Sequence, residues 1–391
     1  MKTCPVARSR HRGLSLIELM VALVLGLIIV AALVQLFLNI SRTNQEMAKT
    51  NSQIENARFA MQFLQNDIVH AGYWGGYIPD FDDLATDGTP PDHEPTAKPD
   101  PVCQAYNPAD ETYRDSLLGI PVEVYGPTAL PNGCGGVVTA RLAETDLLIV
   151  RHAATCVAGE TNCEAPISGK LYMQVSNCID DTEAYVLDPN SAALRELDCL
   201  ISNPAPKRKF VQNIYYIRDH ANVPGDGIPT LMRSEFDLSP GGALEQQTPV
   251  ALVEGIERFW VELGIDRFSR TGDPVNYAQA IEWLDEDVRF TAKNRGDGIP
   301  EGGFERCLSE DGGCEALDDL ANVVAVKLYL LARANTVSPG YTDTKTYELG
   351  SSGPIGPFDD GFKRHVFHST IRLNNIAGRR ETPDPNDVVT P

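Results

Sequence analysis

The sequence has few basic residues for its length. Lys and Arg number 33 against 54 Asp and Glu, which gives a formal net charge of −21 over 391 residues. A polyanion such as DNA would be repelled by most of this surface, so the composition argues against nucleic-acid binding. The short basic run Lys207-Arg208-Lys209 is typical of a solvated loop, and we assign it no function.

Common catalytic motifs are also missing. No GxSxG, HExxH, P-loop or GxGxxG pattern occurs, which removes the usual signatures of several hydrolase and nucleotide-binding classes. The seven histidines are scattered, and the odd spacing of His365 and His368 places them on opposite faces of a strand-like segment. We therefore predict that the protein is not an enzyme and uses no cofactor.

Closely spaced CxxC pairs are absent although the chain has nine cysteines. Structural zinc normally needs such pairs, so the pattern disfavours a metal. Apart from Cys4, the cysteines form an even set, which indicates disulfides made in an oxidising compartment such as the bacterial periplasm. The eight are Cys103, Cys134, Cys156, Cys163, Cys178, Cys199, Cys307 and Cys314.

Spacing predicts part of the connectivity. Cys156 with Cys163, and Cys307 with Cys314, each bracket six residues that include turn formers, so each pair is expected to form a local disulfide. The other four cysteines allow three connectivities, of which 103–134 with 178–199 is the simplest.

Residues 14–38 read LSLIELMVALVLGLIIVAALVQLFL, and Glu18 is their only charge. As a helix this run would span about 37 Å, enough to cross a bilayer. Only basic charges precede it, which predicts a cytoplasmic N-terminus and a remainder on the other side. A carboxylate inside a bilayer costs roughly 2.5–3.5 kcal/mol, so Glu18 should have a partner or a task, unless it reaches the interface by snorkelling.

A second apolar pattern follows the first without any proline between Val6 and Ile78. Its apolar residues recur at spacings of three and four, which is typical of an amphipathic helix. They are Ile54, Ala57, Met61, Leu64 and Ile68. One helix is therefore predicted from residue 14 to about Ala71, where Gly72 offers a stop.

The small residue Gly13 stands directly before the apolar run, whereas a secretory signal has its cleavage site after it. The run Arg12-Gly13-Leu14-Ser15-Leu16-Ile17-Glu18-Leu19 resembles the type III signal of type IV prepilins. That resemblance implies that a prepilin peptidase removes a basic leader, residues 1–13, and that the new amine of Leu14 is methylated. It also implies that Glu18, then the fifth residue, neutralises the N-terminal amine of a neighbouring subunit during assembly. Leu14 departs from the family's commoner Phe.

The segment 79–131 contains ten prolines, which predicts an irregular surface excursion held by cysteines. Later segments have the alternation or the apolar run of sheet strands, and the run at 322–335 is expected to be central, with a helix on one side. The predicted strands cover residues 146–152, 211–218, 257–265, 322–335 and 365–374. The tail 381–391 is predicted to be disordered.

Three stretches resemble strands of the PilW family of pilus-assembly proteins. They are GIERFWVELGID (255–266), VVAVKLYLLARA (323–334) and FHSTIRLNN (367–375). The resemblance implies an α+β, type IV pilin-like fold in which the long N-terminal helix packs on an antiparallel sheet. The globular domain would cover residues 72–391.

GDGIP occurs twice and contains Asp226 in one copy and Asp297 in the other. Such Asp-Gly pairs are typical of turns, and calcium is the alternative because carboxylates lie nearby. Neither copy fills the spaced-acid pattern of an EF-hand loop, so turns are favoured.

The family resemblance implies a structural role. A PilW-type minor pilin would be stored in the inner membrane, would prime pilus assembly with other minor pilins and the major pilin, and would sit at the pilus tip, where it could support an adhesin. One alternative is a J-type minor pseudopilin of a type II secretion system, which has a similar N-terminus. Another is a membrane-anchored adhesive module.

Overall fold

A computed structural model describes residues 15–84, 90–91, 95, 97–189, 194–287, 289–308 and 317–380. The chain divides into two compact units, Met1–Ser52 and Gln53–Pro391. The predicted leader, Leu14 and the tail 381–391 lie outside the described residues.

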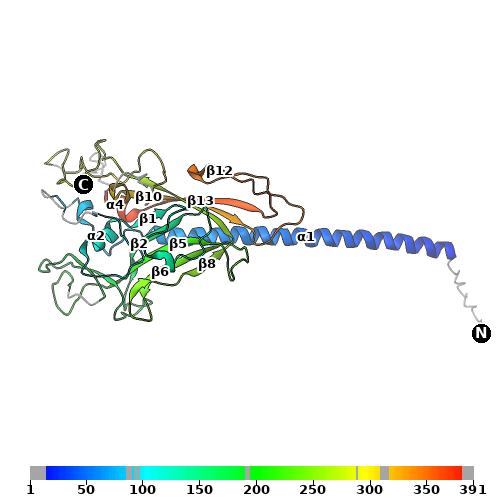
Figure 1. The fold of residues 1–391 in the computed structure, drawn as a ribbon, viewed down its shortest axis with the longest axis horizontal. Helices are drawn as coiled ribbons and strands as arrows, with labels where there is room; N and C mark the ends of the chain where they lie inside the picture. The colour runs from blue at the N-terminus through cyan, green and yellow to red at the C-terminus, as the bar shows by residue number, and fades with distance from the viewer. Residues whose placement is uncertain are drawn as a thin grey trace, which may run out of the picture. The chain divides into compact units, whose positions relative to one another are not determined.

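Helix α1 runs from Leu16 to Ile68 without a break (Figure 1). Its N-terminal part is the one helical stretch, among the residues described, that is long and apolar enough to cross a membrane. None of that stretch is buried within the protein. The described part of the predicted span 14–38 is therefore, by length and composition, a candidate membrane helix.

The helix ends three residues before the predicted limit at Ala71. The N–H groups of His70 and Ala71 donate to carbonyls only three residues back, which tightens the last turn. Gly72 then adopts a φ of +72°, and its N–H donates to the carbonyl of Arg151 instead of continuing the helix. Gly72 therefore supplies the predicted stop.

The C-terminal part of α1 carries the predicted apolar face. Ala57, Met61, Leu64 and Ile68 are buried, which confirms the pattern, while Ile54 is only half-buried. Ala60, on the same face, is also buried.

Eight strands form the larger, antiparallel sheet. Its path is β1-β2-β5-β3-β4, and β6 extends from β5 and pairs with both β7 and β8. The strands are β1 (Val122–Tyr125), β2 (Leu147–Val157), β3 (Tyr172–Val175), β4 (Tyr185–Asp188), β5 (Arg208–Arg218), β6 (Thr230–Leu238), β7 (Leu244–Gln246) and β8 (Val250–Glu254).

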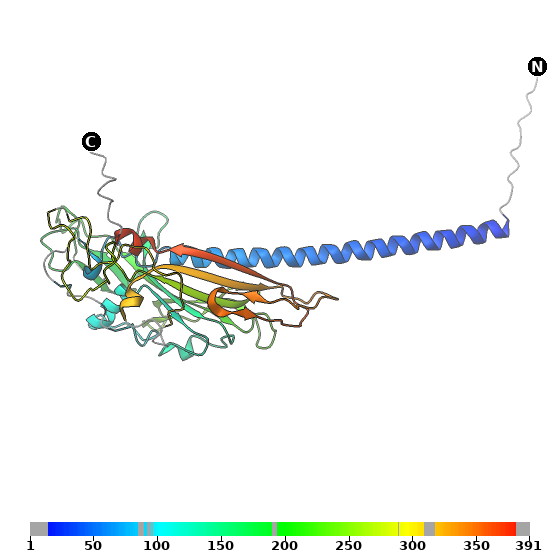
Figure 2. The ribbon, with the colours of Figure 1, turned by 90° about the horizontal axis from the view of Figure 1, so that it is seen from above.

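A second antiparallel sheet has the order β13-β10-β9, and its strands lie side by side in Figure 2. They are β9 (Ile256–Ile265), β10 (Val323–Arg333) and β13 (Arg364–Arg372), and a two-stranded ribbon joins β11 (Tyr347–Glu348) to β12 (Pro354–Ile355). The central place predicted for residues 322–335 is confirmed. The short helix α3 (Leu317–Ala321) precedes β10, and the short helix α4 (Asn374–Arg380) follows β13.

Gly255 explains why the strands form two sheets where one was predicted. It is the single residue between β8 and β9, and its φ is +81°. A Cβ at this position would lie 2.7 Å from the carbonyl oxygen of Arg333, so only glycine fits without a shift. The chain bends at Gly255 and passes from the larger sheet to the smaller one.

Both sheets contribute to one core around the buried face of α1, and the predicted α+β class is confirmed. The core includes Leu148 and Val150 of β2, Tyr215 and Ile217 of β5, Val261 and Leu263 of β9, Leu328 and Leu330 of β10, and Ile371 of β13. The opposite face of β5 is buried as well, because Ile214 and Tyr216 belong to a separate cluster with Tyr125 and Met232.

Part of the prediction for residues 79–131 is wrong. The segment contains a short 3-10 helix (Asp80–Asp82), the helix α2 (Glu111–Gly119) and β1, and the side chains of Val122 and Val124 are fully buried. Residues 109–120 lack proline, and the carboxylate of Asp110 accepts the N–H of Tyr113 as an N-cap. The high proline content of the whole segment hid this proline-free window.

Candidate functional site

The start of α1 is built by a reciprocal cap. The N–H of Ser15 donates to Glu18 Oε2 at 2.9 Å, and the N–H of Glu18 donates to Ser15 Oγ at 3.2 Å. This is the capping box expected of a Ser-x-x-Glu sequence, and it satisfies two N–H groups that the helix leaves unpaired. The sequence contains the signal in Ser15-Leu16-Ile17-Glu18, but our sequence analysis overlooked it.

The predicted assembly residues are only partly described. Glu18 lies in the first turn of α1 and is exposed, and Gly13 and Leu14 lie outside the described residues. Around Glu18 the helix is apolar on all sides, from Leu16 to Ile40, with large side chains about half exposed or more. Glu18 is therefore the single charge on a surface suited to lipid or to other apolar helices.

In the second unit, a polar cluster joins α1 to the larger sheet. The carboxylate of Asp67 lies 2.9 Å from His152 Nε2 and accepts bonds from the amide of Asn213 and the hydroxyl of Tyr215. Burial, reinforced by the negative charge of Asp67, raises the pKa of Tyr215 well above its usual value. These bonds fix the position of the helix on the sheet, and sequence analysis named none of them because the partners are 85 to 148 residues away from Asp67.

Two buried arginines fasten loops to the smaller sheet. Arg364 donates to Asp343 Oδ2 at 2.9 Å and is also paired with Glu257 and Asp360. Arg380 donates to Asp82 Oδ1 at 2.7 Å and to Asp266 Oδ2 at 3.1 Å. Buried charges of this kind are tolerated because each is paired and hydrogen-bonded.

Three disulfides join pairs of described cysteines, in the pairs that spacing predicted or made simplest. They are Cys103–Cys134, Cys156–Cys163 and Cys178–Cys199. Cys307 is also disulfide-bonded, while Cys314 lies outside the described residues. A cluster of Cys178, Asp180 and Cys199 has the spacing of metal ligands, but its two sulfurs are already bonded to each other.

The first GDGIP copy is a turn. The carboxylate of Asp226 accepts N–H groups from Ala221, Asn222, Val223 and Ile228 at 2.8 to 3.2 Å. Those bonds, that of Ile228 first, hold the pKa of Asp226 well below its usual value. The oxygens that would have to bind calcium are thus already used by the backbone.

The second copy lies beside other acids. Carboxylate oxygens of Asp266, Asp297 and Glu301 lie within 4.8 Å of one another. Burial raises the pKa of both Asp266 and Glu301. However, Asp266 already accepts the N–H of Gly298 and a bond from Arg380, so its carboxylate is occupied and holds this copy beside the end of β9.

The basic run is not a solvated loop, because Arg208 and Lys209 lie in β5. Lys209 Nζ lies 2.7 Å from both Glu235 and Asp237 of the neighbouring strand, and the Arg208 guanidinium lies over the ring of Tyr73. Glu235 and Asp237 therefore neutralise the charge of Lys209, which would otherwise attract phosphate.

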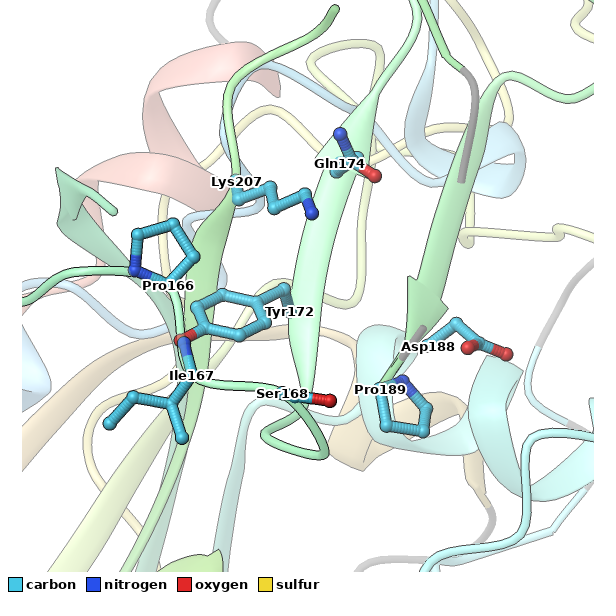
Figure 3. A pocket seen from close by; sticks show the side chains of 8 residues that line it. All are labelled: Pro166, Ile167, Ser168, Tyr172, Gln174, Asp188, Pro189 and Lys207. Carbon is cyan, nitrogen blue, oxygen red and sulfur yellow. The ribbon is translucent and has the colours of Figure 1, made fainter. Parts of the chain in front are cut away.

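Lys207 borders an open depression of about 300 Å³ (Figure 3). Tyr172 and Gln174 of β3 line it together with Asp188 at the end of β4, and Pro166 and Ile167 lie on the side away from Asp188. Its lining contains neither histidine nor cysteine.

Two family models match the chain. Residues 8–34 match the Prokaryotic N-terminal methylation motif, and residues 214–375 match Type IV Pilus-assembly protein W. No match is found among curated proteins. A solved structure, the Type IV-like pilin TTHA1219 from Thermus thermophilus, is similar at 13% sequence identity, with a TM-score of 0.29 over 83% of this chain and 97% of that chain.

The assignment rests on the two family models and not on that structural likeness. The methylation motif covers Gly13, Leu14 and Glu18, and the second match runs from within β5 into α4. These are the same two regions that carried the resemblance in the sequence. Together, the two matches support a type IV minor pilin of the PilW type.

Proposed function

We propose that this minor pilin primes the assembly of a type IV pilus together with other minor pilins and is then incorporated at the pilus tip. A prepilin peptidase cleaves between Gly13 and Leu14, and the new amine of Leu14 is methylated. Until assembly, α1 holds the protein in the inner membrane with its larger unit in the periplasm. This proposal rests on one observation: the methylation motif overlaps an apolar helix whose lone acid is Glu18.

Glu18 has a defined part in the proposed assembly step. One of its oxygens, Oε2, accepts the Ser15 N–H, while Oε1 accepts no hydrogen bond from the described residues. An incompletely paired carboxylate is costly in a low-dielectric environment. The methylated amine of a neighbouring subunit would neutralise it and so favour docking in the filament.

Deletion of the gene tests the proposal against the pseudopilin alternative. We expect the deletion strain to lose surface pili in electron micrographs and to secrete its type II substrates normally, with pili restored by the wild-type gene. Normal pili with failed secretion would instead identify a J-type pseudopilin.

The tip position needs a separate experiment. An epitope inserted after Gly302, in an exposed turn, would be labelled with gold-conjugated antibody on sheared pili. Label at one end of each pilus supports the tip, and label along the shaft contradicts it.

A further inference from the structure

The loop closed by the Cys178–Cys199 disulfide exposes aliphatic side chains to an unusual degree. Ile179 is 96% exposed, Leu197 82% and Ile201 89%, and Leu200 adds 56%. Among the described residues, no other large apolar side chain is more than four-fifths exposed. Single exposed aliphatics are ordinary on protein surfaces, but contiguous ones mark sites of interaction.

The disulfide brings together the two backbone segments that carry these side chains. The Cα atoms of Cys178 and Cys199 are 5.1 Å apart. Ile179 follows the first cysteine and Leu200 follows the second, so the Cα atoms of these two residues lie within about 13 Å of each other, given about 3.8 Å per chain step. Leu197 and Ile201 are two residues from Cys199 on either side.

The loop is held in place by polar bonds that leave the aliphatics outside. Asp181 accepts the hydroxyl of Ser176 at 2.6 Å and both the N–H and the guanidinium of Arg195 at 2.9 and 2.8 Å. The carboxylate of Asp198 accepts the N–H of Leu200 and the amide of Asn203. Because the backbone is fixed in this way, the exposure of the aliphatics is built into the folded loop.

Acidic residues are close in sequence to the apolar side chains. The segment 176–203 contains six acids and one basic residue, Arg195, which is paired with Asp181. Asp180, Glu183 and Asp198 are exposed. A partner must therefore offer an apolar surface with positive charge at its edge.

We propose that the exposed side chains beside the Cys178–Cys199 disulfide, Ile179, Leu197, Leu200 and Ile201, form a docking site for another protein whose surface has an apolar depression bordered by Lys and Arg. The acidic rim disfavours the anionic surface of a bacterial membrane, and it disfavours a second copy of this chain, which carries the same acids and a net charge of −21. The proposal goes beyond pilus priming and does not depend on it.

Photo-crosslinking in living cells tests the proposal on the full chain. A benzophenone amino acid replaces Leu197 or Ile201, and the same substitution at Val223, which is 61% exposed on another loop, is the control. We expect both loop positions, and not the control, to give an adduct with one other protein, identified by mass spectrometry. That protein is then purified and its binding to the full-length chain in detergent is measured.

The binding measurement uses two loop variants and one matched control. Ile179→Ser with Leu200→Ser should weaken binding by about tenfold or more, because central apolar contacts dominate interface energies. Asp180→Lys with Glu183→Lys, at two exposed positions, should weaken it and reduce its salt dependence, while Val223→Ser should change nothing. Unchanged melting curves would show that the variants are folded.

Several outcomes would overturn the proposal. They are an adduct with lipid, an adduct between two copies of this chain, no adduct above the control, and a partner whose affinity is unaffected by either loop variant. Pilus counts of the same variants test the priming function separately, and they do not affect the conclusion about docking.

Discussion

Ser15 and Glu18 bond to each other in both directions at the start of α1, through contacts of 2.9 and 3.2 Å. Glu18 therefore combines a capping task with the proposed pairing task, and one substitution can separate them. A glutamine at this position still serves the cap, so Glu18→Gln removes only the charge. We expect this variant to be cleaved normally but to be strongly depleted from sheared pili on immunoblots.

The matched control is Ser15→Ala, which removes the cap and keeps the charge. It should cost the helix about 1 kcal/mol and still enter pili at close to the wild-type level. The opposite pattern, with Ser15→Ala excluded and Glu18→Gln incorporated, would show that assembly needs the cap and not the carboxylate.

Asp67→Ala should destabilise the second unit by roughly 2–4 kcal/mol, because it leaves Asn213, Tyr215 and His152 without their shared acceptor. The measurement is urea unfolding of the purified protein in detergent. Glu55→Ala, at an exposed position of the same helix, should change stability by less than about 0.5 kcal/mol. A loss of similar size in both variants would mean that the cluster does not fasten the helix.

Removing different disulfides should have unequal effects. The Cys103–Cys134 bond closes a separation of 31 residues and Cys156–Cys163 one of 7. Loop-closure entropy gives about 4 and about 2 kcal/mol for the paired Cys→Ser variants. The side chain of Cys134 is also fully buried, which adds to the first loss. Denaturant midpoints compare the two, and an equal or reversed order would refute the entropic account.

The depressed pKa of Asp226 predicts how the stability of the protein depends on pH. Its pKa is depressed in the folded protein by backbone N–H groups, that of Ile228 first. Its contribution to stability is therefore complete above its unfolded pKa of about 3.9 and is lost as the pH falls through the lower, folded value. Asp226→Asn should lower Tm at pH 7, and the difference from wild type should shrink below about pH 4.

The control for this titration is Glu348→Gln, at an exposed position. Its Tm should follow the wild type throughout. A gap between Asp226→Asn and wild type that stays constant down to pH 2 would indicate that packing, and not the charge, is what Asp226 provides.

Chelation should leave stability unchanged. The carboxylate of Asp226 is occupied by backbone N–H groups, and Asp266, beside Asp297, is occupied by Arg380 and Gly298. A calcium ion would have to displace these donors. A Tm that falls by several degrees in EGTA, recovers with calcium and no longer responds in Asp297→Ala would establish a metal site.

Periodicity predicted the elements that are determined by local patterns of apolar residues and not by distant partners. The face of α1 at Ala57, Met61 and Leu64 and the central strand β10 followed from local patterns of apolar residues. Local patterns also contained α2 and the Ser15–Glu18 cap, but proline content concealed the first and the second was overlooked.

What the sequence could not predict depends on distant partners. The division into two sheets follows from the close approach of Gly255 to Arg333, 78 residues later. The role of Asp67 depends on His152 and Tyr215, which no spacing rule connects to it. The exposed aliphatics of the Cys178–Cys199 loop looked like ordinary apolar residues until their burial was known.

The core around α1 also determines when this protein can fold. Residues 57–68 pack in the same cluster as Ile371, Leu373 and Ile376, about three hundred positions later, and Asp82 is paired with Arg380. Contacts this distant in sequence form slowly and require almost the entire chain. During synthesis the apolar face of the helix therefore stays uncovered until β13 and α4 have been made, although the Cys156–Cys163 disulfide can close early. A chain that stops before residue 364 is expected to remain an unfolded, aggregation-prone polypeptide on its membrane helix.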